Sequence, residues 1–177
     1  MVSMNAPSAK ILVFAGEKFV CIKISGRANF TSSIDFKTLV GELRQKGYQY
    51  FVLDLSECVL MDSTFLGVLT GFGLQMESQN RDAQTRAIEL FNPNPRITDL
   101  LENLGVLHLF RVKHGRVSVP DCTERSHTPV NASREEVTRA CLEAHETLMQ
   151  INPENVARFK EVTQFLAEDL KKLKARQ

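Results

Sequence analysis

A carboxylate and two hydroxyl groups stand side by side in the segment Asp62-Ser63-Thr64, directly before a long run without charge. Side chains of these types often cap the first turn of a helix, because they accept hydrogen bonds from backbone N–H groups that have no partner inside the helix. A phosphate group on Ser63 would also suit this position, since the helix dipole is positive at its N-terminus. The segment is therefore either a simple helix cap or a cap that contains a phosphorylation site at Ser63.

The stretch that follows is predicted to be a helix with no charged residue between Asp62 and Glu77. Its core-facing stripe consists of Phe65, Val68, Leu69, Phe72 and Met76. The opposite side carries small and aliphatic residues, namely Leu66, Gly67, Thr70, Gly71 and Leu74. We expect another surface to cover this side, which is either a partner protein or the C-terminal part of the same chain. A phosphate at its edge would weaken binding of a partner through repulsion and desolvation.

The surrounding sequence alternates between short β patterns and helical patterns. Strands are expected at 10–14, 19–25, 50–55, 87–91 and 110–112, and helices at 32–47, 62–79 and 97–104. Residues Ser56 to Met61 are expected to form a loop before the second helix. This order predicts a small α/β domain in which helices pack on a mixed β-sheet.

Composition divides the chain into four parts: a flexible N-terminus at 1–9, the α/β domain at 10–114, a linker at 115–133, and a C-terminal α-helical hairpin at 134–177. Ser133 and Glu136 form a capping box for the first helix of the hairpin, and Asn152-Pro153 starts the second. The apolar spacing in both helices fits packing onto the domain or a homodimer through the C-terminal helices.

Charge and composition exclude several classes of function. With 22 basic and 21 acidic residues, the chain has no overall field that would attract nucleic acid or a membrane surface. No apolar run is long enough to span a membrane, so we expect a soluble, cytoplasmic protein with reduced cysteines. The cysteines and histidines show no metal-ligand spacing, and no catalytic or cofactor-binding motif occurs. We therefore expect no enzyme activity, no cofactor and no metal.

Four short segments carry a likeness to a known family: Asp54-Leu55-Ser56, Met61-Asp62-Ser63-Thr64, Leu66-Gly67-Val68-Leu69 and Leu90-Phe91-Asn92-Pro93. Through these segments, residues 10–113 resemble a STAS domain of the anti-sigma-factor-antagonist family. The resemblance implies a bacterial module that binds an anti-sigma factor, often a serine kinase, and so frees a sigma factor for transcription. It also implies that the kinase phosphorylates Ser63 and that a PP2C-type phosphatase removes the phosphate.

The chain departs from this family pattern at two positions near the predicted phosphorylation site. Phe65 stands where the family commonly has glycine, and the helical spacing turns its side chain toward the core. Asn29 stands where members often have an acidic residue, so less negative charge lies near Ser63 and its neighbours Asp62 and Thr64, and kinase recognition is expected to differ. Two other functions therefore stay open: a STAS scaffold or oligomerisation subunit that is never phosphorylated, and a small-ligand sensor.

Overall fold

The structure is a computed structural model that describes residues 8–80, 87–118, 123–126 and 131–176. Most of the predicted flexible N-terminus lies outside these residues, as do Cys122 and His127. The strands are β1 (Lys10–Ala15), β2 (Phe19–Ala28), β3 (Tyr50–Asp54), β4 (Cys58–Met61), β5 (Ile88–Phe91), β6 (Arg111–Lys113) and β7 (Thr123–Ser126). The helices are α1 (Phe30–Gln45), α2 (Ser63–Gln79), α3 (Pro95–Asn103), the 3-10 helix η1 (Leu107–Leu109), α4 (Arg134–Ile151) and α5 (Glu154–Ala175).

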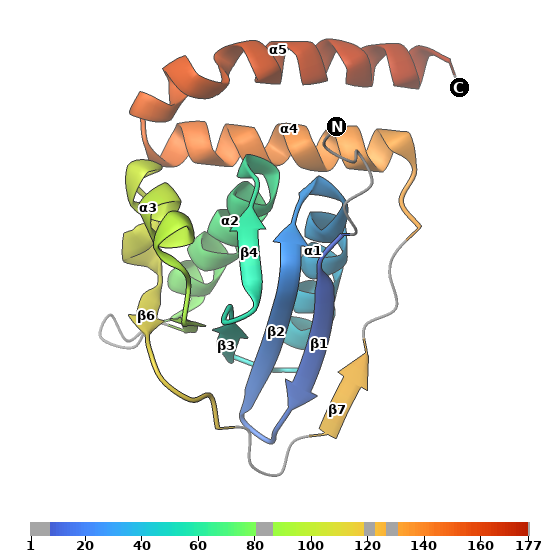
Figure 1. Cartoon of the computed structure of the whole chain (residues 1–177). Coiled ribbons are helices and arrows are strands. Elements are labelled where there is room, and N and C mark those ends of the chain that lie inside the picture. Colours follow the sequence, from blue (N-terminus) through green and yellow to red (C-terminus); the bar gives the residue numbers. More distant parts are fainter. Residues whose placement is uncertain (1–7, 81–86, 119–122, 127–130, 177) are drawn as a thin grey trace, which may run out of the picture.

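The strands form a mixed sheet in the order β6-β5-β3-β2-β1-β7, and β4 pairs separately with β2. β1 and β2 make an antiparallel hairpin, whereas β2, β3, β5 and β6 run parallel. Helices α1 and α2 lie on one face of this sheet, and the α4–α5 hairpin crosses one end of it (Figure 1). This arrangement confirms the predicted mixed sheet with helices packed on it and the C-terminal helical hairpin.

The core lies between the sheet and the α1–α2 pair. Alternate residues of β2 and β3 point into it and are fully buried, namely Val20, Ile22, Ile24, Phe51 and Leu53. Phe65 of α2 is also fully buried, and its ring lies 5.2 Å from that of Phe36. The prediction that Phe65 faces inward is therefore confirmed.

Strand β2 changes partner along its length, and this change determines where α2 starts. Its first half pairs with β3, and its end, from Gly26 to Ala28, pairs with β4, with a register shift between Gly26 and Arg27. Gly26 has a φ of +88°, a conformation that glycine adopts without strain, and its N–H donates to the Glu57 carbonyl at 2.9 Å. At the end of β4 the Asp62 N–H donates to the Ala28 carbonyl at 2.9 Å. The expected loop at 56–61 thus contains a strand that holds the start of α2 against β2.

Helix α1 begins earlier than the sequence pattern indicated. Its N-cap is Asn29, whose side-chain oxygen accepts from the N–H groups of Thr31 and Ser32 at 3.1 Å each. The Ser32 hydroxyl accepts in return from the Asn29 N–H at 2.9 Å. The capping box therefore joins Asn29 to Ser32, and the expectation that the helix starts at Ser32 was wrong by two residues, because α1 starts at Phe30.

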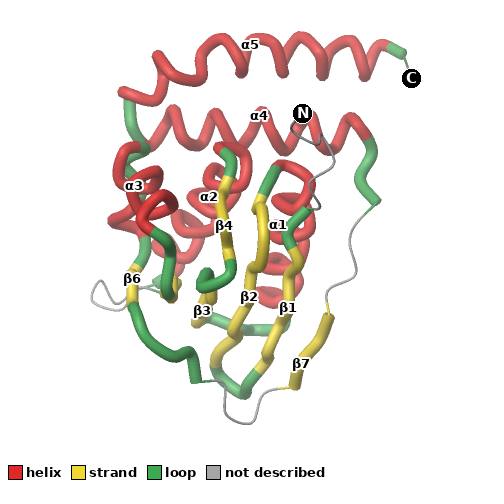
Figure 2. The backbone as a smooth tube through the Cα atoms, viewed as in Figure 1, coloured by secondary structure: helices red, strands yellow, loops and turns green. Residues whose placement is uncertain are grey.

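The C-terminal hairpin packs on the domain of its own chain (Figure 2). Leu148 of α4 is fully buried in the main core, and Ser133 caps α4 together with Glu136 as predicted. The fully buried Asn155 of α5 donates to the carbonyls of Leu104 and Leu148 at 2.9 and 2.8 Å. The hairpin turn is thereby tied to the end of α3. Within 115–133, the expected linker, β7 adds an antiparallel strand beside β1.

Candidate functional site

Asp62 is the residue of the Asp62-Ser63-Thr64 segment that caps α2. One of its side-chain oxygens accepts from the Phe65 N–H at 2.8 Å, and the other accepts from the Phe30 N–H at 2.7 Å. The carboxylate thus fixes the first turns of both α2 and α1. Ser63 follows as the first residue of α2 and is half-buried. Because the Asp62 carboxylate is the cap, the Ser63 hydroxyl is not needed for that role.

The Ser63 hydroxyl points to α4 and forms a hydrogen bond with the His145 imidazole. The distance from Ser63 Oγ to His145 Nε2 is 2.9 Å, and His145 Nδ1 lies 2.6 Å from the Cys141 carbonyl oxygen. A carbonyl oxygen can only accept, so Nδ1 carries a proton and donates to it. In the neutral ring Nε2 then has a free lone pair, and the Ser63 hydroxyl donates to it.

Thr64, the next residue, is also bound to α4. It is buried, and its side chain forms a hydrogen bond with the Cys141 thiol. Burial raises the pKa of the Cys141 thiol, the hydrogen bond with Thr64 lowers it, and the Asp62 carboxylate raises it further. Both hydroxyl residues of the Asp62-Ser63-Thr64 segment therefore connect the start of α2 to a single turn of α4.

The uncharged side of α2 is covered by α4 in this structure. Leu66, Gly67 and Thr70 are buried, while Gly71 and Leu74 are half-buried. The helices approach closely at Gly67, where an added Cβ atom would lie only 2.4 Å from the Ala144 carbonyl oxygen. Of the two expected covers for this side, the structure shows the intramolecular one. Binding of an external partner there stays a prediction.

A groove remains open beside this helix contact. It has a volume of about 360 Å³ and is bordered by α1, α2 and α4, with Gly71 and Thr147 among its lining residues. Across the groove, Lys37 of α1 and Glu143 of α4 form an ion pair at 2.9 Å. Gly71 thus faces open space, whereas Gly67, one turn earlier on the same helix, is in close contact with Ala144.

Asn29 lies close to the phosphorylation site that the sequence predicts, because its neighbours Ala28 and Phe30 both bind the Asp62 residue. Its side chain is occupied by helix capping and by the Ser8 hydroxyl, which donates to it at 3.1 Å. Two apolar side chains are exposed in the same region: Phe30 at the start of α1 is 47% exposed, and Val59 in β4 is 56% exposed. The surface around Ser63 therefore combines a polar segment with apolar side chains open to contact.

His145 and Cys141 were not among the site residues that the sequence predicted. Histidines were considered only as metal ligands, and 82 positions separate His145 from Ser63. A usable signal does exist, because His145 follows Ala144 on the apolar stripe of α4 and lies one turn after Cys141. In the described part of the chain, no group of histidine, cysteine, aspartate and glutamate side chains could hold a metal ion.

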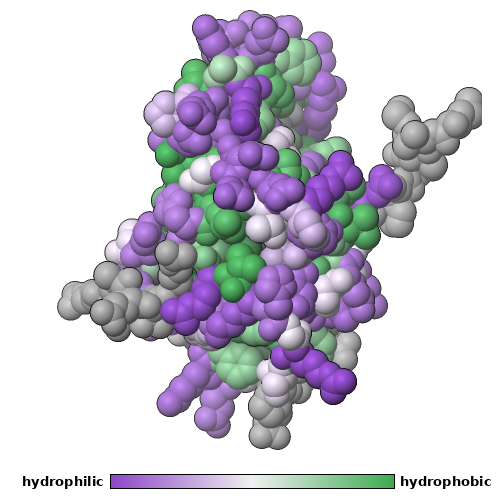
Figure 3. Space-filling model, turned by 60° about the vertical axis from the view of Figure 1, so that its left-hand side comes forward, coloured by the Kyte–Doolittle hydropathy of each residue, from purple (hydrophilic) through white to green (hydrophobic). Residues whose placement is uncertain are grey.

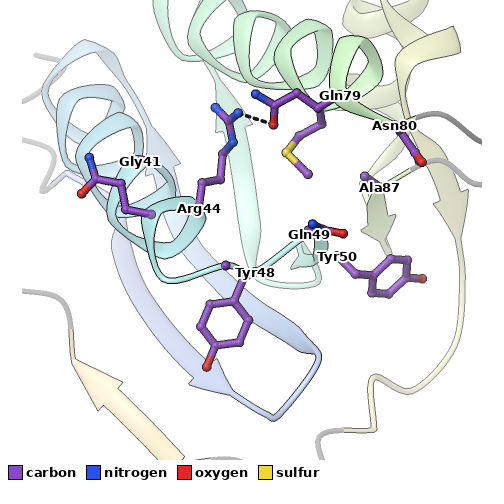
Figure 4. A pocket seen from close by; sticks show the side chains of 11 residues that line it. Gly41, Arg44, Tyr48, Gln49, Tyr50, Gln79, Asn80 and Ala87 are labelled. Carbon is purple, nitrogen blue, oxygen red and sulfur yellow. Dashed lines mark hydrogen bonds between the residues drawn. The ribbon is translucent and has the colours of Figure 1, made fainter.

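A second cavity, of about 650 Å³, lies between the C-terminal ends of α1 and α2 (Figure 4). Arg44 crosses it and donates to the side-chain oxygens of Gln75 and Gln79 at 2.6 Å each. Tyr48 and Tyr50 also line this cavity. It lies at the opposite end of α2 from Ser63, so a small ligand bound there would not touch the Asp62-Ser63-Thr64 segment.

On the face that Figure 3 turns forward, hydrophobic residues form patches that hydrophilic side chains interrupt. Within the described residues, no helix combines the length and the apolar character needed to cross a bilayer.

The comparison with known proteins agrees with this fold. Unphosphorylated SpoIIAA, an anti-sigma factor antagonist, has a TM-score of 0.50 and 15% identity, and the match covers 59% of this chain and 88% of that chain. A Thermotoga maritima protein provisionally assigned as an anti-sigma factor antagonist has a TM-score of 0.50 and 20% identity, covering 59% and 86% of the two chains. No protein with a curated description matches the sequence. The STAS domain model matches residues 12–118, more than half of the chain, and the chain therefore belongs to the STAS domain family.

Proposed function

We propose that this protein is an anti-sigma factor antagonist, a non-enzymatic binding module that phosphorylation of Ser63 switches in a pathway controlling transcription. The observation that carries the proposal is that Asp62 and Ser63 have separate roles at the start of α2. Asp62 caps the helix, so the Ser63 hydroxyl is available for modification without loss of the cap. Ser63 and Thr64 occupy helix positions whose N–H groups lack partners within the helix and favour a negative group.

The proposed partners are an anti-sigma factor with serine kinase activity and a PP2C-type phosphatase. The predicted partner-binding residues of α2 lie under or beside α4, and only Gly71 and Leu74 are partly open. Docking on Gly67 therefore requires α4 to shift, and Leu66 and Thr70 are buried as well. The exposed Phe30 and Val59 offer contact area near Ser63 that is open without such a shift.

Phos-tag electrophoresis of the native protein tests the switch directly. We expect a shifted band that disappears in Ser63→Ala and changes between growth and stress. A single unshifted band under both conditions would leave the non-phosphorylated scaffold as the better assignment. Pull-down from the source organism then compares Ser63→Ala with Ser63→Asp, and we expect the added charge to reduce capture of the anti-sigma factor.

A charge on the partly open side of α2 tests the docking surface. We expect Leu74→Lys to weaken partner capture, because the lysine places a charge on an otherwise uncharged side. The matched control is Ser78→Lys, one turn later at an exposed position of the same helix. Equal capture by both folded variants would remove this side of α2 from the interface.

A further inference from the structure

Among the contacts that the structure describes, the Ser63 hydroxyl is the only polar group of the Asp62-Ser63-Thr64 segment that forms a hydrogen bond with a histidine nitrogen. Its hydrogen bond to His145 Nε2 measures 2.9 Å, and the Cys141 carbonyl holds the ring by accepting from Nδ1 at 2.6 Å. His145 is 5% exposed, and Phe159 of α5 packs edge-on against its ring with 5.0 Å between centroids. The hydrogen bond to the Cys141 carbonyl and the Phe159 contact therefore hold the Nε2 lone pair toward Ser63 Oγ.

Asp62 is the other group near Ser63 that could take a proton, but its geometry does not suit this role. Both of its carboxylate oxygens accept from backbone N–H groups, those of Phe30 and Phe65. A proton on this carboxylate would break a bond that starts a helix. His145 Nε2 can gain a proton while its bond to the Cys141 carbonyl stays intact, since Nδ1 donates in both forms of the ring.

We propose that His145 is the proton acceptor for Ser63 when Ser63 is phosphorylated, so that the C-terminal hairpin completes the phosphorylation site. Ser63 Oγ attacks the terminal phosphorus of a nucleoside triphosphate and forms an O–P bond, while the bond from that phosphorus to the bridging oxygen breaks. The nucleoside diphosphate leaves with that electron pair, and the hydroxyl proton moves to His145 Nε2. This inference rests on the proposed function, because the kinase supplies the triphosphate.

The products fit the same surroundings. Phosphorylation removes the hydroxyl proton, so a neutral Nε2 would face phosphate oxygens with a lone pair. The transferred proton prevents this repulsion, because a cationic imidazole donates to a phosphate oxygen. Ser63 is also the first residue of α2, where free backbone N–H groups favour a negative group. Phosphorylated Ser63 thus remains bonded to α4 through a charged hydrogen bond.

The reactivity of Ser63 toward a fluorophosphonate probe tests the proposal on the full-length chain without a kinase. The probe forms the same Oγ–P bond and releases fluoride, and mass spectrometry locates the product. We expect labelling of Ser63 in the wild type and a rate at least about 100-fold lower in His145→Gln. Glutamine keeps a hydrogen-bonding group at this position but is no base. Thr147→Ala, on the same helix with its hydroxyl bonded to the Glu143 carbonyl, is the matched control and keeps the wild-type rate.

A purely structural role for His145 predicts a different pattern, in which His145→Gln reacts like the wild type and only His145→Ala loses reactivity with helix docking. That pattern would overturn the proposal, as would labelling that bypasses Ser63 in the wild type. Nitrogen NMR of the histidine ring supplies a second readout: we expect a proton on Nδ1 and none on Nε2, and the reverse tautomer contradicts the geometry. The two proposals fail separately, because absence of phosphoserine in cells affects the proposed function while the dependence of the probe reaction on His145 stands.

Discussion

Two glycines on one side of α2 differ in what a methyl group would meet, and this difference gives a prediction with opposite signs. A Cβ atom at Gly67 would lie 2.4 Å from the Ala144 carbonyl oxygen and 2.7 Å from the Ala144 Cβ. At Gly71 the nearest atom is the Thr147 Cγ2, at 4.0 Å. Since relaxed contacts begin near about 3.5 Å, Gly67→Ala must push α4 away by roughly 1 Å, whereas Gly71→Ala requires no movement.

The free energies follow from these distances. Replacing glycine by alanine inside a helix stabilises the fold by about 1 kcal/mol. Overpacking at a tight contact costs about 1–3 kcal/mol or more. We therefore expect Gly71→Ala to raise the free energy of unfolding by about 0.5–1 kcal/mol. At Gly67 the clash is with backbone, so the cost lies at the upper end of its range, and after subtraction of the helix gain Gly67→Ala should lower the free energy of unfolding by about 2 kcal/mol.

Urea unfolding measures both variants, and hydrogen exchange locates the change. Gly67→Ala should raise amide exchange along α4, since the Leu148 and Ala144 contacts loosen, while Gly71→Ala leaves exchange there unchanged. Gly67→Ala should also lengthen the hydrogen bond between Ser63 and His145, which joins the same two helices. If Gly67→Ala proves as stable as Gly71→Ala, α4 does not rest on α2 as described.

Three further predictions concern the elements that hold the site. Asn155→Ala leaves the Leu104 and Leu148 carbonyls without their buried donor and should lower the unfolding free energy by about 1–3 kcal/mol, while the exposed Glu161→Gln on the same helix should change nothing in urea unfolding. Asn29→Ala removes the cap of α1 and should cost about 1 kcal/mol; a thermal melt matching the wild type would contradict the capping box. Burial raises the pKa of the Cys58 thiol from 9.0 to about 11, so the unfolded state loses this proton first and stability should fall between these pH values. Cys58→Ala should reduce that slope in urea unfolding at pH 8 to 11, and an unchanged slope would contradict the shift.

Local patterns in the sequence predicted the elements whose signals are contained in a single segment. The apolar stripe of α2 and the capping box at Ser133 were both read from residues within a few turns of one another. β4 was missed because its four residues form a strand by pairing with the end of β2, more than 30 residues earlier. β7 was missed for a similar reason, since the polar segment Thr123–Ser126 pairs with the distant β1 at the sheet edge.

The candidate site was predicted in part for the same reason. Asp62 and Ser63 are adjacent in sequence, so their position at a helix start was predictable. His145 is adjacent to Ser63 only after α4 has folded back onto α2, and the contact depends on the missing side chain at Gly67. Sequence left open what covers the uncharged side of α2, because a small-residue surface suits any helix that approaches closely.

The attachment of Asn155 to the end of α3 gives the hairpin a fixed pivot. At 1.5 Å per residue, Ala144 lies about 10 Å along α4 from the helix end at Ile151, and Arg134 about 26 Å. A tilt about this pivot that moves Ala144 by roughly 1 Å therefore moves Arg134 by about 2.5 Å. A small displacement of α4 at its contacts with Ser63 and Gly67 is therefore larger at Arg134, the first residue of the hairpin.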